Sequence, residues 1–298
     1  MPAHGSKTVQ TTISTQRFSR PVLRFTYSNQ LGSVMGFWNT SGNDDAKLFR
    51  MNPATFAITD TVQIFNGPGY HIPYNGAYAY YSEPKQLMQV NLLTHQKKGI
   101  DAIISTFGSG PGNIRGSSSQ LVSYGWFGPG SGSTPVYYYT RIYNMATNAS
   151  ISLYMQTSPV TYAISDDGNY VILFNREIYR ITGSPITLIG NLTYTGAWVG
   201  FRQDNCEEAL SVSGNTVYVY DVSTRALKRT ISAPAGSLLI TYDVPTQRLI
   251  YNNTSAKKLY SVHIETGTTK EFNVDLFTFN FMNGAIILNS QEYIKLYE

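Results

Sequence analysis

One short sequence pattern recurs along the chain at a nearly constant interval, and this interval limits the folds that the chain can adopt. Each copy has a polar residue, then an aliphatic or aromatic pair, then alternating apolar and polar residues. The copies align on seven residues: Leu48, Leu87, Ile142, Ile178, Val217, Leu259 and Tyr293. Successive aligned residues lie 39, 55, 36, 39, 42 and 34 positions apart. The sequence therefore predicts seven copies of one structural unit of about 41 residues.

The clearest copy indicates what this unit is. Its four runs of β-branched and aromatic residues are 160–165, 170–174, 177–181 and 186–192. Runs of this kind predict β-strands, and the Gly, Asn, Asp and Pro residues between them predict tight turns. We find no amphipathic stretch of helical period longer than about ten residues. The unit is therefore predicted to be a four-stranded antiparallel sheet.

A four-stranded sheet repeated every 40–45 residues or so is typical of a β-propeller blade. The sequence thus predicts an all-β fold, a single seven-bladed β-propeller domain over residues 1–298. The last copy has runs for only three strands. Segment 7–13, in which Val9, Thr11 and Ile13 alternate with polar residues, is predicted to supply the fourth strand of the last blade and so close the ring.

Two segments resemble the repeats of known propeller families. SDDGNYVILFN at 165–175 and SGNTVYVYDVSTRALKRTI at 213–231 are similar to WD40 and YVTN repeats, with Asp221 where those repeats keep an Asp after the third strand. The resemblance covers roughly residues 160–270, and the Trp-Asp and Gly-His pairs of WD40 blades are missing from the sequence. It implies a propeller with loop-rich binding faces, and no particular partner.

Composition narrows the function classes. Only 13% of the residues are charged, against about 25% in an average soluble domain, which leans toward an extracellular or surface-exposed protein. The first twenty residues contain no signal-peptide core, and no apolar run is long enough to predict a membrane span. Basic runs never exceed two residues, so we expect no specific nucleic-acid binding. The single cysteine, Cys206, excludes an internal disulfide.

Catalytic, metal and cofactor sites are not predicted. The glycines at 108, 110 and 112 lack the spacing and the following helix of a phosphate-binding loop. The four histidines include no pair at metal-ligand spacing. Asp166-Asp167-Gly168 is interpreted as a turn between two strands. We therefore expect no enzyme active site, although the alternative of a propeller hydrolase or lyase stays open.

Two Gly/Ser-rich loop insertions are predicted within 108–134, at 108–119 and 128–134, flanking a strand at 121–126. Trp126 and Phe127 adjoin the second loop and are expected on the face opposite the blade-to-blade connections. Tyr70, His71 and Tyr74 are expected on one of those connections. Exposed Tyr and Trp residues are enriched at binding surfaces.

The candidate partner-binding residues share an expected position on one propeller face; they are Tyr70, His71, Tyr74, Arg115 and Arg176. The leading hypothesis is a non-enzymatic binding or scaffold module that engages a protein partner through this face. The alternative from a different class is a carbohydrate-binding protein at the surface of a cell or virion, because low charge and abundant Tyr, Asn and Ser suit contacts to sugars.

Overall fold

A computed structural model of the chain describes residues 7–8, 22–28, 30–38, 46–52, 57–65, 70–73, 76–83, 86–100, 112–128, 137–155, 161–173, 176–182, 186–193, 198–244, 246–273, 279–282, 285–288 and 292–295. Every regular element in these ranges is a β-strand. The fold is therefore all-β over the described residues, and no helix there is long and apolar enough to cross a membrane.

The described strands lie in seven sheets, which we number in chain order. The first three sheets have four strands each: β2 (Val22–Ser28), β3 (Ser33–Trp38), β4 (Ala46–Met51) and β5 (Ile58–Ile64); β6 (Tyr70–His71), β7 (Tyr78–Glu83), β8 (Gln86–Asn91) and β9 (Lys97–Ile100); β10 (Gly112–Gly116), β11 (Leu121–Gly128), β12 (Tyr137–Asn144) and β13 (Ser150–Met155). Within each sheet, strands adjacent in the sequence pair antiparallel.

The remaining sheets continue this pattern. The fourth and fifth sheets contain β14 (Thr161–Ile164), β15 (Tyr170–Leu173), β16 (Glu177–Arg180) and β17 (Thr187–Asn191); β18 (Trp198–Arg202), β19 (Asn205–Ser213), β20 (Thr216–Asp221) and β21 (Leu227–Ser232). The sixth and seventh contain β22 (Leu238–Asp243), β23 (Arg248–Asn253), β24 (Lys258–His263) and β25 (Thr269–Asn273); β26 (Phe279–Met282), β27 (Ala285–Leu288) and β28 (Glu292–Lys295).

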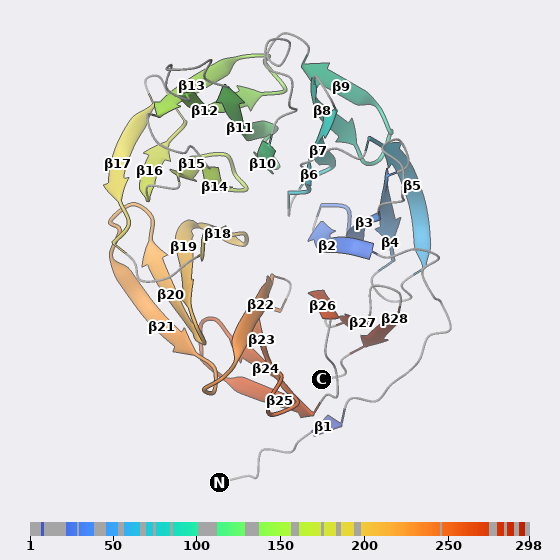
Figure 1. Cartoon of the computed structure of the whole chain (residues 1–298), viewed down its shortest axis with the longest axis vertical. Helices are drawn as coiled ribbons and strands as arrows, with labels where there is room; N and C mark the ends of the chain where they lie inside the picture. The colour runs from blue at the N-terminus through green and yellow to red at the C-terminus, as the bar shows by residue number, and fades with distance from the viewer. Residues whose placement is uncertain are drawn as a thin grey trace.

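The seven sheets are arranged around a ring, with the first strand of each sheet nearest the centre (Figure 1). The last inner strand, β26, contacts β22 on one side and β2 on the other. The first and last sheets of the chain are therefore neighbours, and the arrangement is propeller-like.

The repeat read from the sequence matches this architecture. All seven aligned residues lie on the third strand of their sheets, from Leu48 on β4 to Tyr293 on β28. Leu87, Ile178 and Val217 are fully buried, because a third strand packs against neighbouring sheets on both faces. The strands expected at 160–165, 170–174, 177–181 and 186–192 are confirmed as β14 to β17 within one or two residues at each end.

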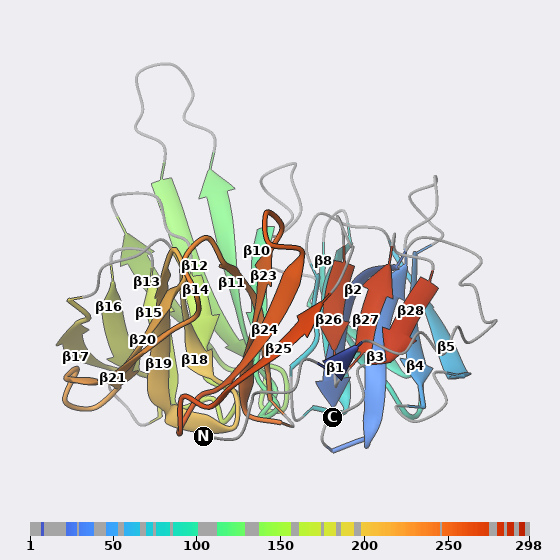
Figure 2. The ribbon, with the colours of Figure 1, turned by 90° about the horizontal axis from the view of Figure 1, so that it is seen from below.

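The ring has two faces that differ in the connections they carry (Figure 2). In a four-stranded antiparallel sheet, the first-to-second and third-to-fourth connections lie at one end. We call this end of the ring the turn face. The second-to-third connections and the links between sheets lie at the other end, which we call the crossover face.

Four third-to-fourth turns of the turn face, those of the second, third, fifth and sixth sheets, share one local structure. In the second sheet, Asn91 Oδ1 accepts hydrogen bonds from the backbone N–H groups of Leu93 and Thr94, both at 2.9 Å. The fifth residue of this turn, His95, has a φ of 59°. The equivalent turns begin at Asn144, Asp221 and His263, and their fifth residues also have positive φ: Asn148, Arg225 and Gly267.

Polar bridges near the turn face join neighbouring sheets from the first to the sixth. Each bridge uses a group at or near a turn: Ser28 Oγ to Gly76 O (3.1 Å), Tyr80 OH to Ser117 O (3.0 Å), Ser118 N to Asp166 O (2.9 Å), Tyr170 OH to Glu207 Oε1 (3.2 Å) and Tyr242 OH to Asp204 Oδ1 (2.8 Å). On the turn face, hydrogen bonds between hairpins therefore join neighbouring sheets.

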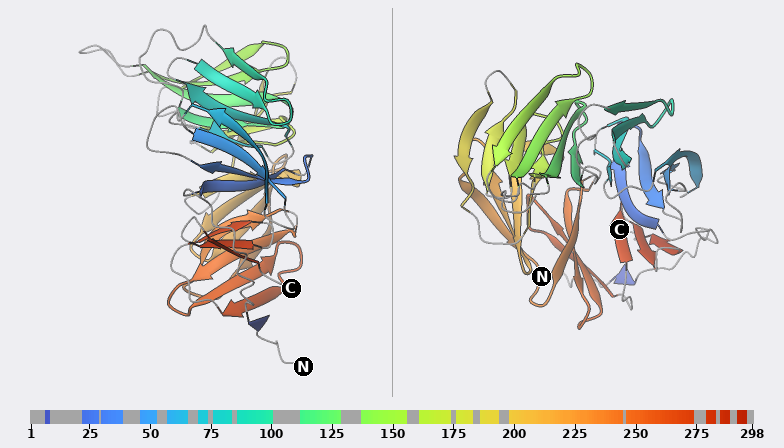
Figure 3. Two further views of the ribbon diagram at one scale, coloured as in Figure 1. Left: turned by 90° about the vertical axis from the view of Figure 1, so that its right-hand side faces the viewer. Right: turned by 45° about the horizontal axis from the view of Figure 1, so that its top comes forward.

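The N-terminal strand does not pair as expected in the residues that are described. Lys7 and Thr8 form β1 (Lys7–Thr8), which pairs in parallel with Phe272 and Asn273 of β25 (Figure 3). These two residues extend the sixth sheet instead of completing the seventh, whose described strands number three. The edge of the outer strand β25 offers backbone groups for such pairing. Residues 9–13 of the expected strand lie outside the described residues.

Candidate functional site

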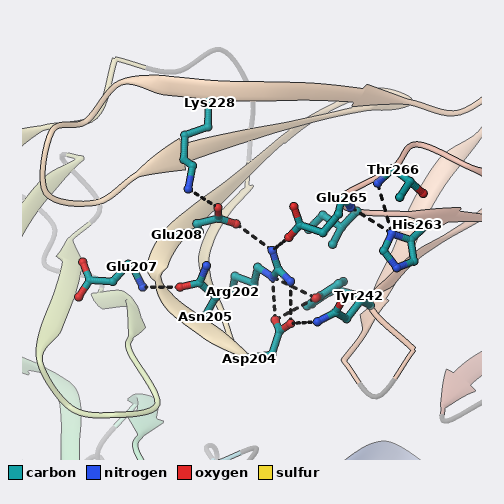
Figure 4. A network of polar contacts seen from close by, with 12 residues as sticks. Arg202, Asp204, Asn205, Glu207, Glu208, Lys228, Tyr242, His263, Glu265 and Thr266 are labelled. Atoms are coloured by element: carbon teal, nitrogen blue, oxygen red, sulfur yellow. Dashed lines mark hydrogen bonds and ion pairs between the residues drawn. The ribbon is translucent and has the colours of Figure 1, made fainter.

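An extended polar cluster lies on the turn face, between the fifth and sixth sheets (Figure 4). Its centre is Arg202, at the end of β18, with 3% of its side chain exposed. The guanidinium donates two hydrogen bonds to Asp204, at 2.8 and 2.7 Å. It also donates to Glu208 at 3.0 Å, to Tyr242 OH at 3.1 Å and to Glu265.

Glu208, on β19, is the second centre of this Arg202 cluster, with 2% of its side chain exposed. Its carboxylate accepts hydrogen bonds from Lys228 Nζ at 2.6 Å and from both terminal nitrogens of Arg229 at 3.1 and 2.7 Å. Arg229 also pairs with Glu265 at 3.1 Å. Because Glu265 belongs to the turn after β24, these contacts tie the fifth sheet to the sixth.

The charges of the Arg202 cluster balance, with three basic and three acidic side chains. Burial alone would raise the pKa of the Glu208 carboxyl, but hydrogen bonds from the three cations outweigh burial and lower it. Burial would lower the pKa of Arg202, but its bonds to Asp204 and Glu265 outweigh burial and raise it. A neutral, mutually satisfied cluster is suited to joining two sheets and not to binding a charged ligand.

The sequence did not single out this cluster. Its only local signal is the concentration of charge at Arg202, Asp204, Glu207 and Glu208 in a chain with few charges. Arg202 and Glu265 are 63 positions apart in the sequence, so their pairing depends on the ring arrangement.

The predicted partner-binding residues are spread over the ring. Tyr70 and His71 were expected on a connection between sheets, but they form β6, the inner strand of the second sheet, because they pair with Tyr81 and Tyr80 of β7. Arg176 is an exposed residue with a φ of 73° in the turn between β15 and β16. Both positions belong to the crossover face. Tyr74 lies outside the described residues.

Arg115 lies elsewhere. It is on β10, beside β6 in the ring, but one residue before the end of the strand that leads into the first-to-second turn. Arg115 Nη1 donates to the carbonyl of Ile114 at 2.9 Å. Arg115 is therefore near the turn-face end of its inner strand, whereas Arg176 lies on the crossover face.

The Gly/Ser-rich region differs from the expected pair of loops. Strand β10 (Gly112–Gly116) lies inside the loop expected at 108–119. With this strand counted, β11 is the second strand of its sheet, and the connection after it belongs to the crossover face. Trp126 and Phe127, near the end of β11, therefore lie on the same face as the links between sheets, and the prediction of the opposite face is wrong.

The described part of the chain holds few clusters of titratable side chains besides the Arg202 cluster. No group of three His, Cys, Asp or Glu side chains there is placed to hold a metal ion. Burial raises the pKa of the Cys206 thiol to about 11, which leaves it protonated and a poor nucleophile near neutral pH. His95 bonds Asp60 at 2.9 Å, and Arg50 pairs with the same carboxylate at 3.4 Å.

Comparison with known proteins shows the fold and not the function. No protein-family model and no curated protein matches this sequence. A chain of the structure titled "Crystal Structure of Mitotic Checkpoint Complex" is similar with a TM-score of 0.61 and 10% identity, over 99% of this chain and 98% of that chain. The structure "KlHsv2 with loop 6CD replaced by a Gly-Ser linker" has a TM-score of 0.57 and 8% identity, over 90% and 88%.

A third similar structure is that of the computationally designed Ika8 protein, with a TM-score of 0.51 and 10% identity, over 98% of this chain and 100% of that chain. With the ring of antiparallel sheets, these likenesses are consistent with a WD40-like β-propeller fold.

Proposed function

We propose that this chain is a non-enzymatic binding module, a seven-bladed propeller that engages a protein partner through its crossover face. One observation carries the proposal, namely that Tyr70, His71 and Arg176 lie at the crossover-face ends of their sheets. The turn face uses its hydrogen-bonding groups to join neighbouring sheets, from Ser28 to Tyr242. The crossover face carries the links between sheets and the second-to-third turns, and binding residues are often carried by such connecting segments on a rigid scaffold.

The residues proposed to make contact are Tyr70, His71 and Arg176. Arg176 directly precedes β16 in the turn after β15 and is exposed, and Tyr and Arg are enriched among residues that dominate binding energy. Arg115 is not included, because it lies near the other end of the inner ring. The propeller class also suits this role, since one of the similar chains belongs to a protein complex.

Affinity capture from the native source, followed by mass spectrometry, tests this proposal with a matched pair of charge reversals. Arg176→Glu changes the crossover face, and Lys97→Glu changes an exposed residue on β9 next to a turn-face turn. We expect one stoichiometric partner that is lost with Arg176→Glu or Tyr70→Ala and kept with Lys97→Glu. A partner kept by both crossover-face variants, or lost with Lys97→Glu alone, would overturn the assignment of the face.

A further inference from the structure

The link between the fifth and sixth sheets, residues 233–237, is fixed on the crossover face by hydrogen bonds. The backbone N–H of Ala233 donates to Asn215 O at 3.0 Å, and the side-chain amide of Asn215 donates to Ala233 O. Asn253 Nδ2 donates to Ala235 O at 3.0 Å. Because Asn215 lies between β19 and β20 and Asn253 ends β23, the link is held between two second-to-third turns. A surface that is ordered before binding loses less conformational entropy when a partner docks.

Leu238 follows this link as the first residue of β22, and 66% of its surface is exposed. This is the largest exposed fraction among the large apolar side chains that the structure describes. Pro234 and Ala235 of the link are also exposed. We call these three residues, together with Lys257, the Leu238 patch. Burial of its apolar surface by an apolar side chain of a partner is favourable.

The charge around the Leu238 patch is positive. Lys257 is exposed in the turn before β24, and Lys258 pairs with Glu271 at 2.5 Å. No Asp or Glu occurs in the crossover-face connections of the fifth and sixth sheets and the residues next to them, which are 213–216, 232–238 and 252–258. A partner that complements this surface therefore carries negative charge.

The register of the sixth sheet gives the spacing between the apolar and basic parts of the patch. Leu238 is opposite Asn252 on β23, and Asn253 is opposite Lys258 on β24. Lys257 directly precedes β24 and is thus two strands away from Leu238. Adjacent strands lie about 4.8 Å apart, so the separation is about 10 Å, the length of about three residues of an extended peptide.

We propose that the Leu238 patch binds an extended acidic segment of a protein partner. An apolar side chain of this segment packs on Leu238, and an Asp or Glu about three residues away pairs with Lys257. This inference rests on the proposed function, binding of a protein through the crossover face, and adds the chemistry of the partner.

The fourth sheet continues the basic character of this face. Arg176 and Lys257 both directly precede the third strand of their sheets and have positive φ, 73° and 53°. Glu177, next to Arg176, accepts a hydrogen bond from Tyr179 OH at 2.7 Å. Cations at two equivalent turns favour an acidic partner over a basic one. They do not form the basic stripe that binds a nucleic acid, so a protein segment is favoured.

Selection of a phage-displayed library of random 12-residue peptides on the immobilised full chain tests the proposal. We expect the enriched peptides to carry an Asp or Glu about three positions from a large apolar residue. One enriched peptide is then synthesised, and its affinity is measured by fluorescence anisotropy. Leu238→Ser and Lys257→Glu should each weaken binding about tenfold or more, whereas Lys257→Arg keeps the charge and should retain most of the affinity.

Two matched controls change the turn face instead. Leu227, like Leu238, is the first residue of its strand and is 52% exposed, and Lys97 is an exposed lysine. Leu227→Ser and Lys97→Glu should change the affinity less than about twofold. The thermal midpoint of each variant is measured in parallel, which separates loss of binding from loss of folding.

The inference is overturned if no peptide is enriched, if the enriched peptides are basic or lack a large apolar residue, or if Leu238→Ser binds them as tightly as the wild type. The capture experiment with Arg176→Glu reports separately on the proposed function. A captured partner that depends on Arg176 but binds Leu238→Ser normally would reject this inference and keep the proposed function. Enriched acidic peptides without any captured partner would support the patch and count against the proposed function.

Discussion

Removing one charge from the Arg202 cluster should destabilise the fold, because it leaves buried cations without a partner, and Glu208→Gln measures this cost. The substitution keeps the shape of the side chain and removes one negative charge. Glu208 is 2% exposed and accepts hydrogen bonds from Arg202, Lys228 and Arg229. Without its charge, three cations face only the carboxylates of Asp204 and Glu265.

Removing one partner from a buried ion pair costs about 3–5 kcal/mol. The lower end applies here for two reasons. Lys228 is 41% exposed and can turn to water, and Arg202 keeps its two hydrogen bonds to Asp204. We therefore expect Glu208→Gln to lower the free energy of unfolding by about 3 kcal/mol, or the thermal midpoint by about 6 °C.

Urea unfolding of the wild type and the variant, followed by circular dichroism, measures this difference. Lys258→Gln is the matched control, because its ion pair with Glu271 is exposed, and its midpoint should equal that of the wild type. The pKa of Glu208 in the folded protein lies below its ordinary value of 4.5. Its charge therefore stabilises the fold fully above pH 4.5, and this stabilisation is lost as the pH falls through the pKa of the folded state. The difference should thus be constant above about pH 5.5 and shrink in acid. A Glu208→Gln variant as stable as the wild type at pH 7 would refute this reasoning.

Three further predictions follow from single residues. Tyr251 is fully buried and its hydroxyl has no hydrogen-bond partner among the residues that the structure describes, so Tyr251→Phe should leave the free energy of unfolding unchanged or raise it by up to about 1 kcal/mol; a variant less stable than the wild type would contradict the prediction. A Cβ at Gly116 would lie 2.2 Å from the buried ring of Tyr80, so Gly116→Ala should cost about 1–3 kcal/mol in the same urea assay, and an unchanged midpoint would show that the ring can move. Burial raises the pKa of the Cys206 thiol to about 11, so it should react with iodoacetamide at pH 8 on the order of 100-fold more slowly than a free cysteine. A reaction as fast as that of a free cysteine would show that the thiol is not buried in this way.

The sequence predicted the strands well where a local pattern determines them. Ile142, Val217 and Leu259 mark third strands that are apolar because both faces are buried. Strand β10 was missed because GNIRG has one apolar residue, Ile114, and two glycines. It is a strand because it pairs with β11. That omission also placed Trp126 on the wrong face. Without β10, β11 is counted as the first strand of its sheet, and the connection after a first strand lies on the turn face.

Long-range pairing was not predictable in the same way. Arg202 meets Tyr242 and Glu265 because the fifth and sixth sheets are neighbours in the ring. Nothing near Arg202 in the sequence identifies these partners. Likewise, an alternating segment such as 7–13 indicates a strand but not which outer edge it joins, and Lys7 and Thr8 pair with β25.

Hydrogen–deuterium exchange of the free protein and of its complex with the captured partner tests the central claim, binding through the crossover face, most directly. The turn-face amides of Ser118, His95 and Arg225 donate hydrogen bonds within the chain. Their exchange should be the same in the free and bound protein. The account predicts new protection at Tyr70, His71 and Arg176. Protection confined to the turn-face hairpins, with no change at these three residues, would contradict it.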